Sequence, residues 1–204
     1  MNDFDLKAQD WDADPSKIAR ALRTAESIGD RVPDLARRRV LEIGCGTGLL
    51  GLALHPHAAH VTLADTSAGM LAVLRAKVAA AGLQGVTVLQ HDFTEGPLPR
   101  DRYGLLCSLM TFHHIPDSDE ALRRFHALLE PGGVLCLADL DTEDGSFHGA
   151  EVLVHHGFDR ADLEARMGRA GFQDIAFDTP CAITKATPAG TKTYPVFLAV
   201  ARKP

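Results

Sequence analysis

The stretch of residues 40–48, VLEIGCGTG, decides how the rest of the sequence is interpreted. Its first four residues form a short apolar run that is typical of a buried β-strand. Three alternate glycines follow, Gly44, Gly46 and Gly48. Glycine lets a backbone turn tightly and brings its N–H groups close to a ligand. The stretch therefore predicts a strand that ends in a ligand-binding turn.

Short apolar runs alternate with longer amphipathic runs on both sides of this stretch. The expected strands are residues 40–43, 61–64, 86–89, 105–110, 134–138, 175–177 and 196–200. Helices are expected to begin at Asp14-Pro15, at Thr66 or Ser67, at Asp117 and at Asp159. Such alternation indicates βαβ units and a mostly parallel, twisted sheet that is covered on both faces. No linker rich in Gly, Pro or Ser divides the chain, so residues 1–204 are expected to form one α/β domain.

Charge and hydropathy exclude several classes of protein. The chain has 27 acidic residues against 21 Lys and Arg, a net charge of −6, and its one basic run is residues 37–39. A nucleic-acid partner is therefore not expected. No apolar run approaches the roughly 20 residues of a membrane-spanning helix, and the acid-rich start is unlike a signal peptide. A cytoplasmic protein without a membrane partner is predicted.

The cysteines fit the same compartment. The chain has four of them, and no two form a CxxC pair: Cys45, Cys107, Cys136 and Cys181. Three of the four lie in or beside apolar runs. Buried free thiols in a reducing compartment are therefore predicted.

Acidic residues follow the next two expected strands. Ligands of open α/β sheets bind beyond the carboxyl ends of the strands, near the point where the strand order reverses. Asp65 ends the second expected strand, 21 residues after Gly44, and can accept hydrogen bonds from both hydroxyls of a ribose. Asp92 and Phe93 end the third, where a carboxylate can accept an adenine amino proton and a ring can face the base. Together these positions predict a nucleotide-like ligand.

Two kinds of nucleotide cofactor compete for this site. Gly46, Gly48 and Gly51 satisfy the GxGxxG fingerprint of a dinucleotide site, with Asp65 about 20 residues further on. Glu42, however, precedes the first glycine by two residues, where it would repel a pyrophosphate and suit an ammonium group. A cofactor with adenosine at one end and an amino acid, with its ammonium group, at the other is S-adenosylmethionine. Glu42 therefore favours S-adenosylmethionine over a dinucleotide. The alternatives are an NAD(P)-dependent oxidoreductase and a non-catalytic sensor of S-adenosylmethionine or a nucleotide.

The same residues resemble the motifs of a known family. Residues 40–48 look like the first motif of the class I S-adenosylmethionine-dependent methyltransferases. Asp65, Asp92-Phe93, residues 109–115 and residues 129–133 resemble its later motifs, in the family's order, and the likeness runs from about Trp11 to the C-terminus. The resemblance implies a three-layer, Rossmann-like, seven-stranded sheet with helices on both faces and the last strand antiparallel.

The resemblance also implies which residues hold the cofactor. The turn from Gly44 to Gly48 would hold the methionine end, Asp65 the ribose, and Met70 would lie against the adenosine. Trp11 resembles the aromatic residue of an N-terminal helical lid, here residues 1–34. The expected cofactor-binding residues are Trp11, Glu42, Gly44, Cys45, Gly46, Gly48, Asp65, Thr66, Met70, Asp92, Phe93 and Leu109.

Methyl transfer places few demands on catalytic residues. It is an in-line displacement at a carbon already activated by a sulfonium cation, so the protein acts mainly through proximity and orientation. A general base is needed only where the acceptor still carries its proton. His113 and His114 follow the fourth expected strand and are the candidate bases, or else walls of the pocket.

A long polar stretch, residues 139–158, is predicted to form a cap on the acceptor side. The residues expected to contact the acceptor are His114, His148, His156 and Phe158. The acceptor is expected to be a small molecule, because little chain remains beyond the core fold for docking a macromolecule. The chain is expected to act as a monomer or homodimer.

Two groups of residues have side chains that could ligate a metal ion. Asp139, Asp141 and His148 offer oxygen and nitrogen ligands, but the Asp-Asn pair of metal-using relatives is absent after the fifth expected strand. A run of histidines at His55, His57 and His60 flanks Pro56 away from the predicted site, and is assigned to a surface loop. No metal site is therefore predicted.

Overall fold

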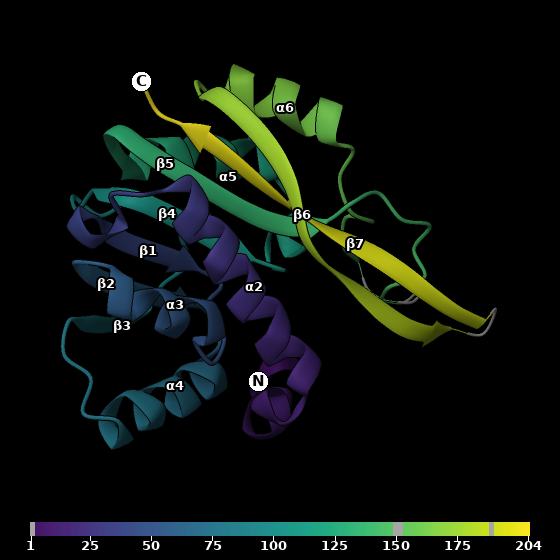
Figure 1. Ribbon diagram of the computed structural model, residues 1–204, viewed down its shortest axis with the longest axis horizontal. Helices are drawn as coiled ribbons and strands as arrows, with labels where there is room; N and C mark the ends of the chain where they lie inside the picture. Colours follow the sequence, from purple (N-terminus) through teal and green to yellow (C-terminus); the bar gives the residue numbers. More distant parts are fainter. Residues whose placement is uncertain (1–2, 149–152, 188–189) are drawn as a thin grey trace.

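One seven-stranded sheet forms the centre of the computed structural model, which describes residues 3–148, 153–187 and 190–204 (Figure 1). The strand order is β3-β2-β1-β4-β5-β7-β6. β1 to β5 pair in parallel, and β7 runs antiparallel to both β5 and β6. The strands are β1 Arg39–Ile43, β2 His60–Asp65, β3 Val86–Gln90, β4 Tyr103–Leu109, β5 Leu129–Leu140, β6 Gln173–Thr187 and β7 Gly190–Arg202. The predicted sheet, with its last strand antiparallel, is confirmed.

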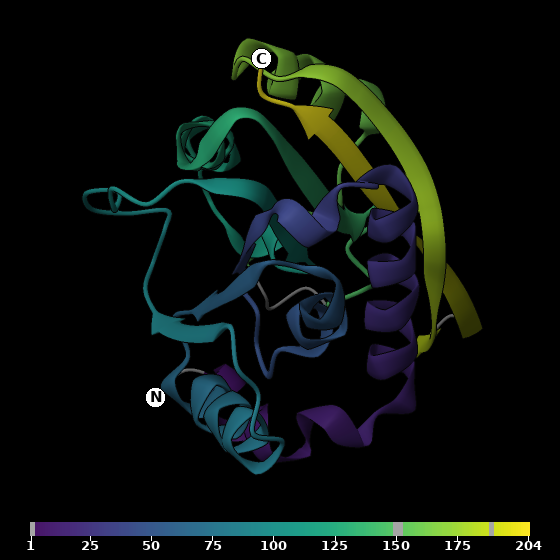
Figure 2. The same cartoon turned by 60° about the vertical axis from the view of Figure 1, so that its left-hand side comes forward.

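Helices cover both faces of this sheet. Successive side chains of a strand point to opposite faces. In β1, Val40 packs into the cluster that includes α2, α3 and α4, whereas Leu41 packs into the cluster of α5 and α6. Figure 2 shows α2 along one side of the molecule, with β6 beside it. The α-helices are α1 Asp3–Lys7, α2 Pro15–Arg31, α3 Leu49–Leu54, α4 Ala68–Ala80, α5 Ser118–Leu128 and α6 Arg160–Arg169. The 3-10 helices are η1 Ala8–Ala13, η2 Leu35–Arg37, η3 His55–His57 and η4 Phe112–His114.

Four α-helices begin at the side-chain caps that the sequence predicts. A cap stabilises a helix because its oxygen accepts a hydrogen bond from an otherwise unpaired N–H of the first turn. Asp14 caps α2, Asp117 caps α5 and Asp159 caps α6. In each case a carboxylate oxygen accepts, at 2.9 Å, from a backbone N–H of the first turn, that of Ser16, Glu120 and Asp162 respectively. For α4 the cap is Ser67, whose Oγ accepts from the Met70 N–H at 3.2 Å.

The hairpin of β6 and β7 is much longer than the strands predicted at residues 175–177 and 196–200, and it extends beyond the rest of the sheet (Figure 1). Pro180 and Pro195 interrupt the two runs, and proline cannot donate to a sheet ladder. The structure accommodates both. Pro180 lies in the edge strand, and Pro195 lies just beyond the last residue pair of β5 and β7, Leu140 with Val196.

The order of the strands fixes where a ligand can bind. From β1 the chain moves outward to β2 and β3, and from β4 it moves outward in the opposite direction to β5. The strand order therefore reverses between β1 and β4, and the residues after these two strands border the crevice where such sheets bind ligands. Cys45, Cys107 and Cys136 are buried free thiols, as predicted, and Cys181 is half-buried. Across the described ranges no helix has both the length and the apolar character to cross a membrane.

Candidate cofactor and acceptor site

The glycine turn lies at the carboxyl end of β1, as the sequence predicts. Gly44, Gly46 and Gly48 all have positive φ, at 70°, 52° and 82°. Side chains with a Cβ rarely adopt this region, so the turn depends on glycine at all three positions. The Gly48 N–H donates to the Cys45 carbonyl at 2.8 Å, which closes the turn before α3 begins at Leu49.

The three glycines of the turn differ in what a Cβ at each position would meet. A Cβ at Gly44 would lie 2.2 Å from Cγ2 of Thr111, and a Cβ at Gly48 would lie 2.5 Å from Cδ1 of Leu74. Protein atoms therefore occupy the space beside those two. A Cβ at Gly46 would meet nothing closer than Met70 Sδ at 3.9 Å. Gly46 is thus the one glycine of the three where a Cβ would fit, in van der Waals contact with Met70 and Trp11.

Asp65 holds the turn from the end of β2. One carboxylate oxygen accepts from the Gly46 N–H at 2.7 Å, and the other accepts from the Ser67 N–H at 2.8 Å. Each oxygen of a carboxylate has a second lone pair. Asp65 can therefore keep both backbone bonds while it accepts from a ribose, which stays a prediction.

Asp65→Ala is expected to weaken binding of S-adenosylhomocysteine by about 1–3 kcal/mol, because it removes the ribose acceptor and the support of the turn. The measurement is calorimetric titration of the variant and the unaltered protein. Ser67→Ala is the matched control, since it removes the cap of α4 but keeps the Asp65 carboxylate. Equal losses of affinity in the two variants would assign the effect to a loosened start of α4 and N-terminal segment, and not to the ribose contact.

The N-terminal segment, α1 with η1, lies across this turn. Trp11 Nε1 lies 4.0 Å from the Cβ position of Gly46. Asp12 accepts from the Thr47 hydroxyl at 2.5 Å and pairs with Lys77 Nζ at 2.7 Å. Asp5 accepts from the Ser67 hydroxyl at 2.6 Å. The segment predicted as part of a lid over residues 1–34 therefore covers the turn, although residues 1–2 lie outside the described ranges.

Asp12→Asn is expected to speed the dissociation of S-adenosylhomocysteine about 5-fold, because a half-exposed ion pair and hydrogen bond of this kind contribute about 1 kcal/mol. Stopped-flow displacement measures the rate. Asp10→Asn, at an exposed acid of the same 3-10 helix, serves as the control. An unchanged dissociation rate in Asp12→Asn would show that this contact does not hold the segment over the ligand.

Glu42 lies below the turn and is buried. Its Oε2 accepts from the Gly51 N–H in the first turn of α3 at 2.9 Å. Burial raises the pKa of Glu42 to about 8, against the opposing effect of the Gly51 hydrogen bond. The carboxyl is therefore largely neutral at pH 7, so it neither repels a phosphate nor attracts an ammonium group as strongly as the sequence argument assumes. Its contact with an ammonium group stays a prediction.

The expected adenine side is only partly open. Asp92 is exposed and accepts from the Thr94 N–H at 2.8 Å. The ring of Phe93 is 1 % exposed and packs in the core, so in this structure it does not face an open site. An adenine contact at Phe93 would have to come from its backbone. Thr66 is exposed and Leu109 is half-buried.

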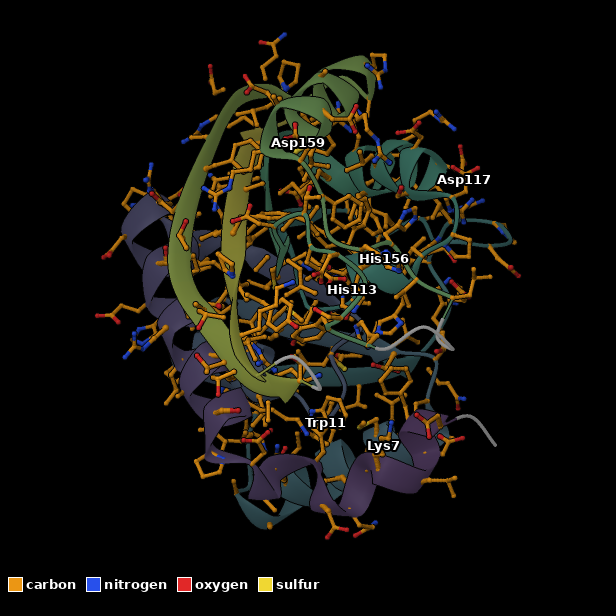
Figure 3. All side chains as sticks on the ribbon, turned by 90° about the vertical axis from the view of Figure 1, so that its right-hand side faces the viewer. Lys7, Trp11, His113, Asp117, His156 and Asp159 are labelled. Atoms are coloured by element: carbon orange, nitrogen blue, oxygen red, sulfur yellow. The ribbon has the colours of Figure 1, made fainter. Side chains whose placement is uncertain are left out.

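Three histidines meet on the acceptor side of the turn. His113 and His114 belong to η4, directly after β4, and His148 belongs to the loop after β5. Ring nitrogens of all three lie within 4.8 Å of one another. His113 Nε2 lies 2.9 Å from His148 Nε2. Figure 3 looks onto this end of the molecule and labels His113 near the centre, with Trp11 below it.

A buried carboxylate supports this cluster. Asp139 in β5 is fully buried, and its Oδ1 lies 2.6 Å from His113 Nδ1. The backbone N–H groups of His113 and Leu140 also donate to this carboxylate, at 3.1 and 2.8 Å. Burial, followed by the nearby His113, lowers the pKa of both His114 and His148 to about 4. These two rings are therefore neutral at pH 7.

The other two residues expected to contact the acceptor, His156 and Phe158, are not members of this cluster. His156 is exposed, and its ring would lie 2.9 Å from a Cβ at Gly145. Phe158 is 5 % exposed, with its ring centroid 5.0 Å from that of Phe112. Of the four residues expected to contact the acceptor, the structure brings together His114 and His148. Residues 149–152 of the cap lie outside the described ranges.

Sequence reasoning missed three residues that link the parts of this site. Thr111 donates from its hydroxyl to the Gly44 carbonyl at 3.1 Å and so ties η4 to the glycine turn. Met110, just before it, has a φ of 55°, a strained value for a residue with a side chain. The ring of Phe4 lies 6.0 Å from Trp11 and 5.3 Å from His114. Met110 and Thr111 lie within the motif-like residues 109–115, but the resemblance gives neither of them a role, and no motif marks Phe4.

Fold and site together define an α/β protein with a nucleotide-type cofactor site at the switch point of its sheet. A family model described as a methyltransferase domain matches residues 40–133. An uncharacterized methyltransferase from Geobacillus kaustophilus is 35 % identical over 156 residues, which cover 75 % of this chain and 65 % of that protein. A ubiquinone biosynthesis O-methyltransferase from Xanthomonas euvesicatoria is 31 % identical over 183 residues, which cover 80 % of this chain and 75 % of that protein.

A solved structure has the same fold. Phosphoethanolamine N-methyltransferase 2 from Haemonchus contortus, in complex with S-adenosyl-L-methionine, has a TM-score of 0.71 at 18 % identity. The match covers 89 % of this chain and 52 % of that one. The chain belongs to the class I S-adenosylmethionine-dependent methyltransferase family.

Proposed function

We propose that this protein transfers the methyl group of S-adenosylmethionine to a small-molecule acceptor. The observation that carries the proposal is the glycine turn after β1, where Gly46 has room for a Cβ, donates its N–H to the Asp65 carboxylate and is covered by Trp11. Membership of the family and the S-adenosyl-L-methionine complex of a protein with the same fold support the choice of cofactor.

The arrangement of the site fits catalysis by proximity. The glycine turn would hold the methionine end of the cofactor, and Trp11 and Met70 would cover the cofactor. The acceptor would then approach from the side of His113, His114 and His148, where the loop after β5 closes the site. An in-line displacement needs the nucleophile, the methyl group and the sulfur held in one line, which can supply several kcal/mol of the barrier reduction.

An oxygen acceptor is favoured over the other classes. The O-methyltransferase relative acts, by its name, on an oxygen. A hydroxyl must lose its proton during transfer, and the neutral imidazoles of His114 and His148 can accept one. An acceptor screen should therefore begin with small phenols and other hydroxylated compounds.

Calorimetric titration with S-adenosylhomocysteine, with NADH as a parallel titrant, tests the proposal. Binding of S-adenosylhomocysteine in the micromolar range without binding of NADH is the expected result. Binding of NADH alone would overturn it in favour of a nicotinamide-dependent oxidoreductase. A protein that binds S-adenosylhomocysteine but methylates no compound in a broad screen would be a sensor and not an enzyme.

A further inference from the structure

The histidine cluster has more nitrogen ligands in one place than proton transfer needs. One base is enough to deprotonate an acceptor, yet three imidazoles from two segments separated by 35 positions in the chain converge here. The ring centroid of His148 lies 4.8 Å from that of His113 and 5.2 Å from that of His114. The three rings thus surround a common point on the acceptor side.

We propose that His113, His114 and His148 bind one divalent transition-metal ion of the zinc type. Imidazole nitrogen is a preferred ligand of zinc, copper, nickel and iron. With Zn–N bonds of about 2.0–2.1 Å, the nitrogens of a tetrahedral site lie about 3.3–3.4 Å apart. The Nε2 atoms of His113 and His148 are 2.9 Å apart, so they must separate by about half an ångström. The nitrogens of all three rings lie within 4.8 Å of one another, so His114 must also approach the other two by up to about 1.4 Å. His148 lies in a loop and His114 in the short 3-10 helix η4, where such adjustments are possible.

Asp139 has the position of a carboxylate that orients a metal-binding histidine. Histidine ligands usually donate their second ring N–H to a carboxylate or carbonyl, which fixes the tautomer and the direction of the ring. The pair of His113 Nδ1 with Asp139 Oδ1 at 2.6 Å provides this contact, and leaves Nε2 directed at His148. The backbone N–H of Leu140 holds the carboxylate in turn. A bound cation would also balance the charge of this buried carboxylate.

Two lysines act against a cation at this place. Lys7 of α1 and Lys185 of β6 both lie near enough to His148 to lower its pKa. Both lysines are exposed, so solvent and salt screen their charges. Three imidazole rings in one place and a buried carboxylate beside them favour the ion more directly than the screened lysines oppose it.

Three protein ligands leave one coordination position open, as in catalytic zinc sites. An oxygen ligand fits that position best, and the acceptor's own oxygen is the ligand that the position would take. This last part depends on the proposed function, whereas the metal site itself does not.

Metal binding to the metal-free protein tests the site directly. The full chain is treated with EDTA, dialysed, and titrated with Zn²⁺ and separately with Co²⁺, whose visible absorption reports tetrahedral nitrogen ligation. One equivalent is expected to bind. His114→Gln and His148→Gln are each expected to lower the affinity about 100-fold or more, and Asp139→Asn about 10–100-fold, as for other supporting carboxylates. His57→Ala, at an exposed histidine of η3, is the matched control and should bind as the unaltered protein does.

Several results would overturn the site. These are no binding by the unaltered protein, unchanged affinity in both glutamine variants, or a loss of binding in His57→Ala. If a variant does not fold, the unaltered protein still decides, because Zn²⁺ must shield the peptides that contain residues 113–114 and 148 from diethyl pyrocarbonate. Added acetohydroxamate should shift the Co²⁺ spectrum, and an unchanged spectrum would contradict the open position. Titration of the metal-free protein with S-adenosylhomocysteine tests the proposed function separately.

Discussion

Gly46→Val is expected to abolish binding of S-adenosylhomocysteine, with a loss of affinity of about 100-fold or more, while the protein stays folded. A Cβ at Gly46 would touch Met70 Sδ at 3.9 Å and Trp11 Nε1 at 4.0 Å, at the place where the cofactor would bind. A valine there would occupy it and press on both covering side chains. Calorimetric titration measures the affinity, and circular dichroism with thermal melting monitors the fold.

Backbone strain must be separated from the loss of space. Gly46 has a φ of 52°, and a side chain in this region costs about 1–2 kcal/mol, or more for a β-branched residue. Gly82, after α4, has a φ of 60° and nothing within 4 Å of its Cβ position. Gly82→Val therefore carries a similar strain away from the site. The same affinity in Gly46→Val and Gly82→Val would contradict the placement of the cofactor.

Glu42→Gln is expected to make the protein more stable than its parent at pH 9, by about 2–5 kcal/mol, and to differ little from it at pH 5. In the folded protein the pKa of Glu42 is raised from 4.5 to about 8. Between these two values the folded state holds a proton that the unfolded state has lost. Stability must therefore fall as the pH rises from about 5 to 8, and level off above that. Glutamine has no such titration, and its amide oxygen can still accept from the Gly51 N–H.

Urea denaturation at pH 5, 7 and 9 measures the free energy of unfolding of both proteins. Glu164→Gln removes an exposed carboxyl on α6 and serves as the control. Its free energy of unfolding should still fall between pH 5 and pH 9, as that of the parent does. The prediction is contradicted if the free energy of unfolding falls by the same amount from pH 5 to pH 9 in Glu42→Gln and in its parent. That result would show that Glu42 is ionised in the folded protein throughout this range.

The fold could be predicted because its signals are local. β3 was expected at residues 86–89 and spans Val86–Gln90, since a short apolar run between turns specifies a strand without help from distant residues. The caps at Asp117 and Asp159 each depend on a hydrogen bond from the residue three positions further on. The length of the β6–β7 hairpin could not be predicted, because the tolerance of Pro180 and Pro195 depends on which strand edges lie free in the folded sheet.

The site shows the same difference between features with a local signal in the sequence and features that depend on distant residues. The glycine turn and Asp65 were found because a tight turn and a strand-end acid leave a mark in the sequence. The pairing of His148 with His113 leaves no mark, since the two residues are 35 positions apart in the chain and meet only when the loop after β5 returns over η4. The backbone N–H of His155 donates to the His113 carbonyl at 2.9 Å, which is one contact that fixes this return. Phe93 shows the opposite case, in which a motif position is used for core packing.

The place of β7 in the sheet has a consequence for the order in which the sheet can form during synthesis. β7 leaves the ribosome after β5 and β6, yet it lies between them and is hydrogen-bonded to both. Until residues 190–202 are available, β6 has no neighbour to join and β5 has an unpaired edge. The buried Phe197 and Leu198 of β7 also complete the two cores on either face of the sheet. A nascent chain stalled before this point would expose an open strand edge, the feature that most readily recruits other chains into aggregates.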